Sequence, residues 1–452
     1  MRRFKLTYYL LIALMSVVNL SGCSQDEFTE NQDKEQSQVK AQLILSLSIP
    51  VIGTRAEGIT LSGTAGENKC RKLTLFVMST DGTNIQDYTV TGENLENKNL
   101  LFNVTNSQGA KKILVAANMS DTQIAAIKNT KNCNPEQIIQ NISDITTEGN
   151  FLMTGQAVDR NNSQIITIEA NQTIEIKASL TRVMSKVLLT CSTKDDNALY
   201  VKLAQDNGYI RLEDIHYILE TTNKKFFPFE KNKNEDPNFL MSNTLADSYG
   251  NNFFRATIDE TEGAIAIKYD ASRLTEGDYQ YTEGIYCLEN TIKIDDVPSD
   301  SDDPKKVATY FKIAAKFTPK NIDGSENLSE ERAKRMLNAG TFYTCKKAPA
   351  NVKNMCYSSI AEGIAYLSNK NTTVTNEDFT IHEGGWQRYE TFINSPTNFS
   401  EAAGLIRNNY YIINVTSFTA PLVDKTIEVN TIVAPWTTKG KTTIEVETGN
   451  NK

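Results

Sequence analysis

Short stretches in which apolar and polar residues alternate recur along most of the chain, and this period of two predicts β-strands. The first has one firmly apolar face, made by Leu43, Leu45, Leu47 and Ile49. The same signature predicts strands at residues 71–78, 100–104, 111–117, 167–180, 186–191, 215–219, 264–269, 307–317 and 410–418. Because the stretches are short and separated by turn residues, they indicate an all-β, mainly antiparallel protein with two β-sandwiches.

Signals for helices are few. Ser120 is suited to cap a helix that ends at Ile127, and Ser329 to cap one that ends at Leu337. The pair Asn134-Pro135 predicts a third helix through Ile142. We expect a turn at 224–228 and place the domain boundary there, which gives domains at 56–222 and 223–452.

The beginning of the chain has the pattern of an export signal. Basic residues at positions 2, 3 and 5 precede an apolar run over 8–20, which is too short to serve as a permanent membrane anchor. Leu20-Ser21-Gly22-Cys23 then resembles the lipobox of bacterial lipoproteins. The pattern predicts a signal peptide over 1–22 and a lipid on the Cys23 sulfur, with a secretory signal and an incidental cysteine as the alternative. Residues 24–40 are polar and predict a flexible tether.

Composition narrows the possible partners. The chain has 452 residues and a net charge of -8, without a long run of Lys or Arg, which argues against a nucleic-acid partner. No later stretch has the length and apolarity of a membrane-spanning helix. Six cysteines follow Cys23: Cys70, Cys133, Cys191, Cys287, Cys345 and Cys356. They are expected either to be mostly free thiols or to form one or two disulfides, and the sequence favours neither alternative.

Residue patterns of catalysis are missing. The two histidines, His216 and His382, lie in an alternating stretch and beside a glycine pair, which favours structural roles. The motifs HExxH, GxSxG and GxGxxG and the P-loop are absent, so we expect neither an enzyme nor a cofactor. The five aspartates within residues 295–304 could form a weak calcium loop, but the segment lacks EF-hand spacing, and a solvated acidic loop is favoured.

Several strings, in order along the chain, resemble the fimbrillins of Bacteroidales-type (type V) pili, closest to the major subunit of minor fimbriae. Those in the first half are the 71–78 strand, KKILVAAN at 111–118, FLMTG at 151–155 and LTRVMSKV at 180–187. Those in the second half are YCLEN at 286–290, the stretch from Gly384 to Ile393 and RNNYY at 407–411. The resemblance implies that both sandwiches are transthyretin-like.

The resemblance also implies a mechanism of assembly. The precursor travels to the outer membrane as a lipoprotein and is then cut after an Arg, a position that Arg55-Ala56 matches, although Arg71 stays possible. Residues 23–55 would be a propeptide that carries the removable first strand. Its loss would open a groove that a strand of another copy can fill.

The candidate donor strand lies at the C-terminus. Ile427, Val429, Thr431 and Val433 alternate with other residues, Pro435-Trp436 is expected to break the run, and Ile444 and Val446 resume it. The alternative is that this segment only completes its own domain. A head-to-tail contact of this kind gives an open filament.

We therefore expect a structural subunit, stalk or tip, of an adhesive fimbrium on the cell surface. Its partners would be copies of itself and related subunits, the outer membrane through lipid, an Arg-specific or trypsin-like protease, and a possible host protein or glycan. The alternative is an uncut surface lipoprotein or anchor subunit, in which the first strand stays in place.

Overall fold

A computed structural model of the protein divides into two units, Met1–Gln38 and Val39–Lys452, and all that follows concerns the second. The residues that the structure describes are 40–48, 61–147, 149–194, 199–231, 235–238, 253–254, 263–275, 281–291, 308–393, 404–419 and 427–437. Several residues singled out in the sequence lie outside these ranges: Cys23, Ile49, Arg55, Ala56, Ile444, Val446 and the acidic stretch 295–304.

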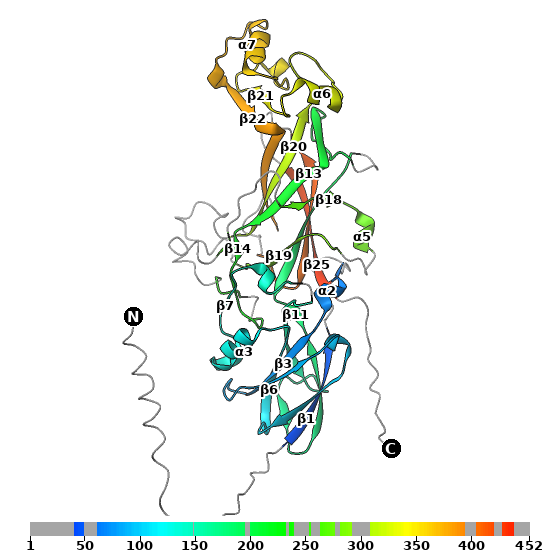
Figure 1. The fold of residues 1–452 in the computed structure, drawn as a ribbon, viewed down its shortest axis with the longest axis vertical. Coiled ribbons are helices and arrows are strands. Elements are labelled where there is room, and N and C mark those ends of the chain that lie inside the picture. Colours follow the sequence, from blue (N-terminus) through cyan, green and yellow to red (C-terminus); the bar gives the residue numbers. More distant parts are fainter. Residues whose placement is uncertain are drawn as a thin grey trace, which may run out of the picture. The chain divides into compact units, whose positions relative to one another are not determined.

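A nine-stranded sheet is built entirely from the first part of the described chain, shown in blue to green in Figure 1. Its main order is β4-β3-β6-β8-β10-β1-β5, with β9 beside β6 and β11 beside β8. The bounds are β1 Lys40–Ser48, β3 Lys72–Ser79, β4 Gln86–Thr91, β5 Leu100–Thr105, β6 Gly109–Ala117, β8 Met153–Val158, β9 Ile166–Ile168, β10 Thr173–Ser179 and β11 Thr181–Arg182.

Two further sheets contain strands from both halves of the sequence. The six-stranded sheet has the order β18-β12-β24-β25-β2 with β19 beside β12, and the four-stranded sheet has the order β17-β13-β20-β23. The bounds are β2 Leu61–Ser62, β12 Met184–Cys191, β18 Ile267–Lys268, β19 Ile285–Leu288, β24 Asn409–Phe418, β25 Ile427–Thr437, β13 Gly208–Glu220, β17 Ala264–Ile265, β20 Tyr310–Pro319 and β23 Trp386–Phe392.

Two-stranded pairs and short helices complete the described part. The pairs are β14 Thr222–Asn223 with β16 Phe253–Phe254, β15 Lys225–Phe226 with β7 Gln137–Ile138, and β21 Phe342–Cys345 with β22 Phe379–His382. The α-helices are α2 Ala65–Asn68, α3 Asp121–Lys128, α5 Ala271–Thr275, α6 Glu330–Met336 and α7 Ile360–Ser368. The 3-10 helices are η1 Leu95–Asn97, η2 Lys131–Cys133, η3 Ile142–Asp144, η7 Ala350–Val352, η8 Asn376–Asp378 and η9 Glu383–Gly385.

Alternation of side chains gives the nine-stranded and six-stranded sheets two apolar faces each. One face of the nine-stranded sheet, including Leu75 and Val115, encloses a first core together with Leu43 and Leu45 of β1. The opposite face shares a second core with residues of β12 and β24, and the other face of β12 and β24 packs with β13 and β20 around a third core. The six-stranded sheet is therefore covered on both faces, which explains why every residue of β12 is buried.

The all-β fold class is confirmed, since most described strand pairs are antiparallel and the helices are short. The predicted strands are present, except that the stretch 167–180 is divided into β9 and β10 and the stretch 264–269 into β17 and β18. The helices capped by Ser120 and Ser329 are present too, and both serine side chains accept a bond from the helical backbone. Strands β12 and β13, which precede the boundary expected at 222/223, pair with β24 and β20, which follow it. The two-domain division and the transthyretin-like topology stay predictions.

Two local predictions are wrong. No helix begins at Asn134: its side chain is bonded to the backbone of Phe229, at 2.8 and 2.9 Å, and β7 pairs there with β15. The expected turn at 224–228 is thus partly strand. Pro435-Trp436 does not break the C-terminal strand either, because β25 continues to Thr437.

Candidate functional site

Strand β1 lies between two strands that come later in the chain. Gln42–Ser48 run parallel to Thr173–Ser179 of β10, and Lys40–Leu45 run antiparallel to Leu100–Thr105 of β5. The ladder continues past the strand end, where Leu180 N donates to the Ser48 carbonyl at 2.8 Å. The first described strand is therefore an interior strand, joined to the described residues that follow it only through residues 49–60.

The apolar face predicted for β1 is confirmed for the described residues. Leu43 and Leu45 are 0% exposed, whereas Leu47 is half-buried. Gln42 is exposed on the other face, where its amide donates to Asn103 at 3.2 Å. The alternation thus directs every second side chain of β1 into the first core.

Removal of β1 would expose the first core to solvent on one side. Phe102 of β5 and Ile176 of β10 are buried against the same cluster as Leu43 and Leu45. Among the described strands, β5 pairs only with β1, so it would lose its place in the sheet. The backbone of β10 would become an unpaired edge beside an apolar groove, which is a template for another strand.

The chain is anchored again soon after residues 49–60. Leu61 is fully buried, and Leu61–Ser62 form β2, which pairs with Trp436 and Thr437 of β25. Thr64 caps the short helix α2 through a capping box, in which Thr64 N donates to the Glu67 carboxylate at 2.7 Å. This cap positions Glu67, which is only 2% exposed.

Glu67 is the centre of a buried charge cluster. Its Oε1 accepts from Lys186 Nζ at 2.7 Å and from the Tyr286 hydroxyl, and its Oε2 lies 3.4 Å from the hydroxyl of Tyr410. The Lys186 ammonium also lies over both tyrosine rings, 5.2 and 5.5 Å from their centroids. We call Glu67, Arg182, Lys186, Tyr286 and Tyr410 the Glu67 cluster.

The charges of this cluster depend on each other. Burial on its own raises the pKa of Glu67, but the charge of Lys186 and the bonds from Lys186 and Tyr286 lower it below its usual value. Burial lowers the pKa of Lys186, against the attraction of Glu67, and lowers the pKa of Arg182 to about 10. Removing the carboxylate would therefore leave buried cations without a counter-ion, which is expensive in a protein interior.

Arg182, on β11, holds the short helix α2 that carries Glu67. Its guanidinium is fully buried and donates to the Glu67 carbonyl at 3.4 Å, to the side chain of Asn68 and to the side chain of Asn408 at 3.2 Å. The side chain of Asn408 also accepts from the backbone N–H of Arg182 at 3.1 Å. Arg182 thus joins α2 to the start of β24.

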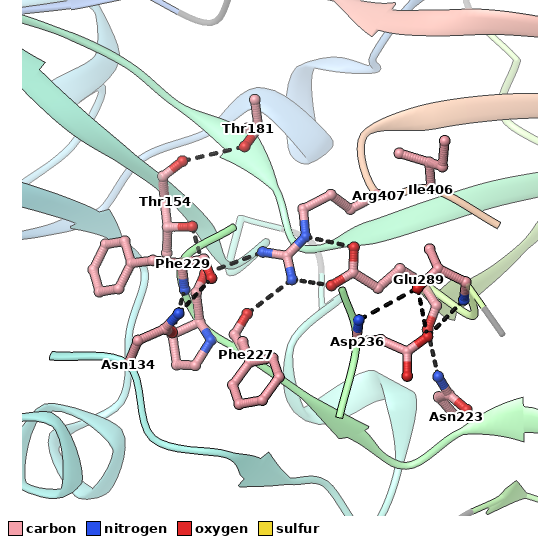
Figure 2. A network of polar contacts seen from close by, with 12 residues as sticks. Asn134, Thr154, Thr181, Asn223, Phe227, Phe229, Asp236, Glu289, Ile406 and Arg407 are labelled. Atoms are coloured by element: carbon pink, nitrogen blue, oxygen red, sulfur yellow. Dashed lines mark hydrogen bonds and ion pairs between the residues drawn. The ribbon is translucent and has the colours of Figure 1, made fainter. Parts of the chain in front are cut away.

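A second buried ion pair, between Arg407 and Glu289, lies just before the start of β24 (Figure 2). Arg407 Nε donates to Glu289 Oε2 at 2.9 Å, and a second bond joins Nη2 to Oε1, so the pair is bidentate. The guanidinium also donates to the carbonyls of Phe227 at 2.9 Å and Pro228 at 3.3 Å. Burial opposes the charge of Arg407, but the attraction of Glu289 prevails and raises its pKa.

The candidate donor strand is paired within the chain. β25 runs antiparallel to β24, with Thr431 opposite Ile413 and Val433 opposite Tyr411. Ile427 and Val429 are half-buried against the third core. The described part of the C-terminal segment therefore completes its own sheet, which is the alternative left open above for these residues.

The histidines and cysteines singled out in the sequence make packing contacts or are free thiols. His382 is stacked on Phe342, with ring centroids 4.5 Å apart, and bonded to Thr344 at 2.9 Å, whereas His216 lies 6.0 Å from the ring of Trp386. All six cysteines of the described part are free thiols, five of them buried, and burial raises the pKa of Cys70 and Cys133 to about 12. In the described ranges no helix has the length and apolarity to cross a membrane, and no acidic, histidine or cysteine side chains gather as a metal site would require.

Sequence reasoning missed Glu67. The string Thr64-x-x-Glu67 has the form of a capping box and could have predicted the short helix. It could not have predicted the ion pair, because Lys186 is 119 residues away in the chain. The three strings at 180–187, 286–290 and 407–411 supply Arg182, Lys186, Tyr286, Glu289, Arg407 and Tyr410, so they meet in these two buried networks.

Comparison with known proteins identifies similar solved structures. One is a protein from Parabacteroides distasonis assigned to cell adhesion, with 11% identity, a TM-score of 0.46 and coverage of 89% of this chain and 99% of that chain. The fimbrilin of Porphyromonas gingivalis has 15% identity, a TM-score of 0.42 and coverage of 88% and 99%. The tip fimbrial protein Mfa3 of the same organism, truncated at its C-terminus, has 11% identity, a TM-score of 0.42 and coverage of 88% and 100%. No protein-family model and no curated protein matches the chain.

Proposed function

We propose that the protein is a structural subunit, stalk or tip, of a cell-surface adhesive fimbrium. It is exported as a lipoprotein precursor and polymerises by strand exchange once proteolysis has released its first strand. The observation that carries the proposal is the position of β1, an interior strand that is attached to the described residues after it only through residues 49–60. The fimbrillin resemblance of the sequence points in the same direction.

The free energy of burial explains why an emptied groove would be refilled. Leu43 and Leu45 are fully buried, and each contributes about 1.5–3 kcal/mol through burial. Loss of the ladders with β10 and β5 adds the cost of unpaired backbone groups. A strand from another copy that offers apolar residues at every second position would recover both contributions by β-augmentation.

The positions of Arg55 and Arg71 in the sequence favour Arg55 as the cut site. Arg55 lies in the sequence between the end of β1 at Ser48 and the first anchored residue, Leu61. Arg71 follows Glu67, so a cut there would detach the only carboxylate bonded to Lys186 among the described residues. A cut between Arg55 and Ala56 releases β1 and leaves the Glu67 cluster intact.

For the donor, we propose the C-terminal segment that contains Ile427, Val429, Thr431, Val433, Ile444 and Val446. The first four belong to β25, which must leave β24 before it can pair with another copy, whereas Ile444 and Val446 follow that strand. Deleting residues 438–452 removes only the part beyond β25. If this deletion blocks assembly and the purified subunit keeps its stability, the final segment is the donor. Normal filaments after the deletion would leave β25 as the donor or contradict strand exchange.

The lipid on Cys23 has a temporary role in this proposal. It holds the uncut precursor at the outer membrane, and the cut removes Cys23 together with residues up to Arg55. The mature subunit then resides in the fimbrium at the cell surface. The protease is of Arg-specific or trypsin-like type, since it recognises one basic residue.

The decisive experiment compares the wild type with Arg55→Ala and Arg71→Ala. Treatment of the purified precursor with an Arg-specific protease should create an N-terminus at Ala56 and produce multimers. Arg55→Ala should remain a monomer and keep β1, whereas Arg71→Ala, the matched control, should still assemble. Filaments of normal length from Arg55→Ala, or only monomers after a complete cut at Ala56, would refute the proposal.

A second candidate is an uncut surface lipoprotein or anchor subunit, and one observation favours it. In the described chain β1 pairs on both sides and β25 pairs with β24 within the same molecule, as a stable monomer requires. Such a protein would present a ligand-binding surface without polymerising. N-terminal sequencing of surface-extracted material separates the two, because a chain that begins at Ala56 has been cut, whereas the uncut lipoprotein keeps its original N-terminus.

A further inference from the structure

A groove of about 870 Å³ opens where the start of β13, the residues after β20 and the end of β24 approach each other. Its walls include Lys194, Lys202 and Lys320, one carboxylate from Asp206, and the rings of Tyr200 and Tyr209. Among the described residues on its walls, three lysines outnumber one aspartate, so this part of the groove is net positive although the whole chain carries -8. A local excess of cations in an acidic protein attracts anionic ligands.

The three lysines are not equivalent. Lys194 and Lys320 both bond to Oδ1 of Asp206, at 3.0 and 2.6 Å, and these bonds lower the pKa of Asp206. Lys202 is exposed and makes no ion pair with another described residue. Its backbone makes two hydrogen bonds. Lys202 N donates to the Ser192 carbonyl at 3.0 Å, and the Lys202 carbonyl accepts from Phe418 N at 3.1 Å. A rigid backbone therefore presents an ammonium group that is available to a ligand.

The two tyrosines form a rigid aromatic wall. Their ring centroids lie 5.4 Å apart, and both hydroxyls are already used: Tyr200 donates to Glu330 at 2.6 Å and Tyr209 to the Leu328 carbonyl at 3.0 Å. Because the hydroxyls are bound elsewhere, the rings contribute hydrocarbon surface to the groove. The Lys320 ammonium lies over the Tyr209 ring, 5.1 Å from its centroid, and the Arg211 guanidinium lies over the Tyr200 ring at 5.8 Å. Such surfaces pack against the C–H face of a pyranose ring, whereas an acidic peptide needs mainly charge.

From these three observations we propose that the groove binds an acidic saccharide, a sugar that carries a carboxylate or a sulfate. Lys202 pairs with the acidic group, Tyr200 and Tyr209 pack on the ring, and Lys194 and Lys320 keep further N–H groups for sugar oxygens. The site belongs to the uncut monomer, so its test is independent of cleavage and strand exchange.

The experiment uses isothermal titration of the full-length chain with 3′-sialyllactose, lactose and hexaglutamate. We expect 3′-sialyllactose to bind at least about tenfold more tightly than lactose, since one well-placed charge pair contributes about 1.4 kcal/mol, a factor of ten. Hexaglutamate should not compete at equal charge concentration. Equal binding of the two sugars, absence of binding by both, or preference for hexaglutamate would each overturn the proposal.

Variants assign the effect to the groove. Lys202→Glu should weaken binding of 3′-sialyllactose by about tenfold or more. Lys202→Arg, which keeps the charge, and Lys177→Glu, which reverses an exposed charge on β10, should both stay within about twofold of the wild type. If Lys177→Glu and Lys202→Glu weaken binding equally, the attraction comes from overall charge, and the groove is not the site.

Discussion

At the scale of single residues, the buried charges depend most on contacts between distant segments. The sequence shows Arg182 and Lys186 four positions apart, but nothing in that string reveals their partners or that they belong to two strands, β11 and β12. The partners come from α2 and from the start of β24, and a pattern with a period of two carries no information about such contacts. For the same reason, the free state of the six thiols could be decided only by the structure.

The first prediction concerns Glu67. Glu67→Gln keeps the shape of the side chain but leaves Lys186 buried without a counter-ion, so the free energy of unfolding should fall by about 3–5 kcal/mol. The matched control is Glu93→Gln, because the Glu93 side chain is 65% exposed while it pairs with Lys69 and Arg71. Its loss should leave the free energy of unfolding almost unchanged, because solvent screens an exposed ion pair. Urea titration measures both, and equal midpoints for the two variants would contradict the role given to the Glu67 cluster.

The second prediction concerns Asp236, whose carboxylate accepts from Thr291 and Asn238 beside the Arg407–Glu289 pair (Figure 2). Burial raises the pKa of Asp236 to about 6, well above its value in an unfolded chain. The native state therefore holds this proton more tightly, and its contribution to stability improves as the pH falls from 7 towards 4. A difference of about two pKa units corresponds to roughly 2–3 kcal/mol.

The measurement for Asp236 is the free energy of unfolding at several pH values for the wild type and for Asp236→Asn. The difference between them should shift in favour of the wild type as the pH falls. Asp121→Asn is the control, because the Asp121 side chain is 95% exposed. A difference that stays constant between pH 7 and pH 4 would show that Asp236 ionises normally.

At the scale of elements, alternation predicted strands well and local helix signals less well. Asn134-Pro135 has the form of a helix start, but the Asn134 side chain bonds the backbone of Phe229, and β7 takes β15 as a partner. A tertiary pairing outweighed the local preference. Pro435 is tolerated in β25 because that strand pairs with β24 on one side and only with the two residues of β2 on the other, so few N–H groups are needed there.

The third prediction tests the face of β1. Leu45→Ala empties a site that is fully buried and should lower the free energy of unfolding by about 2–5 kcal/mol. Ile44→Ala is the matched control, because Ile44 is a neighbour of similar size that is only half-buried on the opposite face. Its effect should be less than half as large in the same urea titration. A larger effect at Ile44 would mean that the opposite face of β1 is the one in contact with the core.

At the scale of the whole molecule, the three large sheets do not depend equally on β1. β1 contributes to the first core, whereas the cores around β12, β24, β13 and β20 contain none of its residues. Alternation could predict that sandwiches would form. It could not predict that β12 and β13 would pair with C-terminal strands, because pairing between distant strands is absent from local patterns.

The fourth prediction is the response to loss of β1. After a cut at Arg55 and removal of the released strand, amide hydrogen exchange should accelerate in β5 and β10, which lose a ladder partner. Exchange in β13 and β20 should stay as slow as in the intact chain, since their partners remain. The cut chain with β1 still bound is the control. Uniform acceleration across all sheets would show that β1 supports the whole fold and is not a removable part.

The way in which the sheets divide the sequence also permits an order of folding. Every strand of the nine-stranded sheet lies between Lys40 and Arg182, so this sheet can form before the later residues have been synthesised. The six-stranded sheet must wait for β24 and β25, the last strands described. In the proposed strand exchange, β1 is thus in place before the C-terminal strand of the same chain emerges, which protects the precursor from premature strand addition during synthesis.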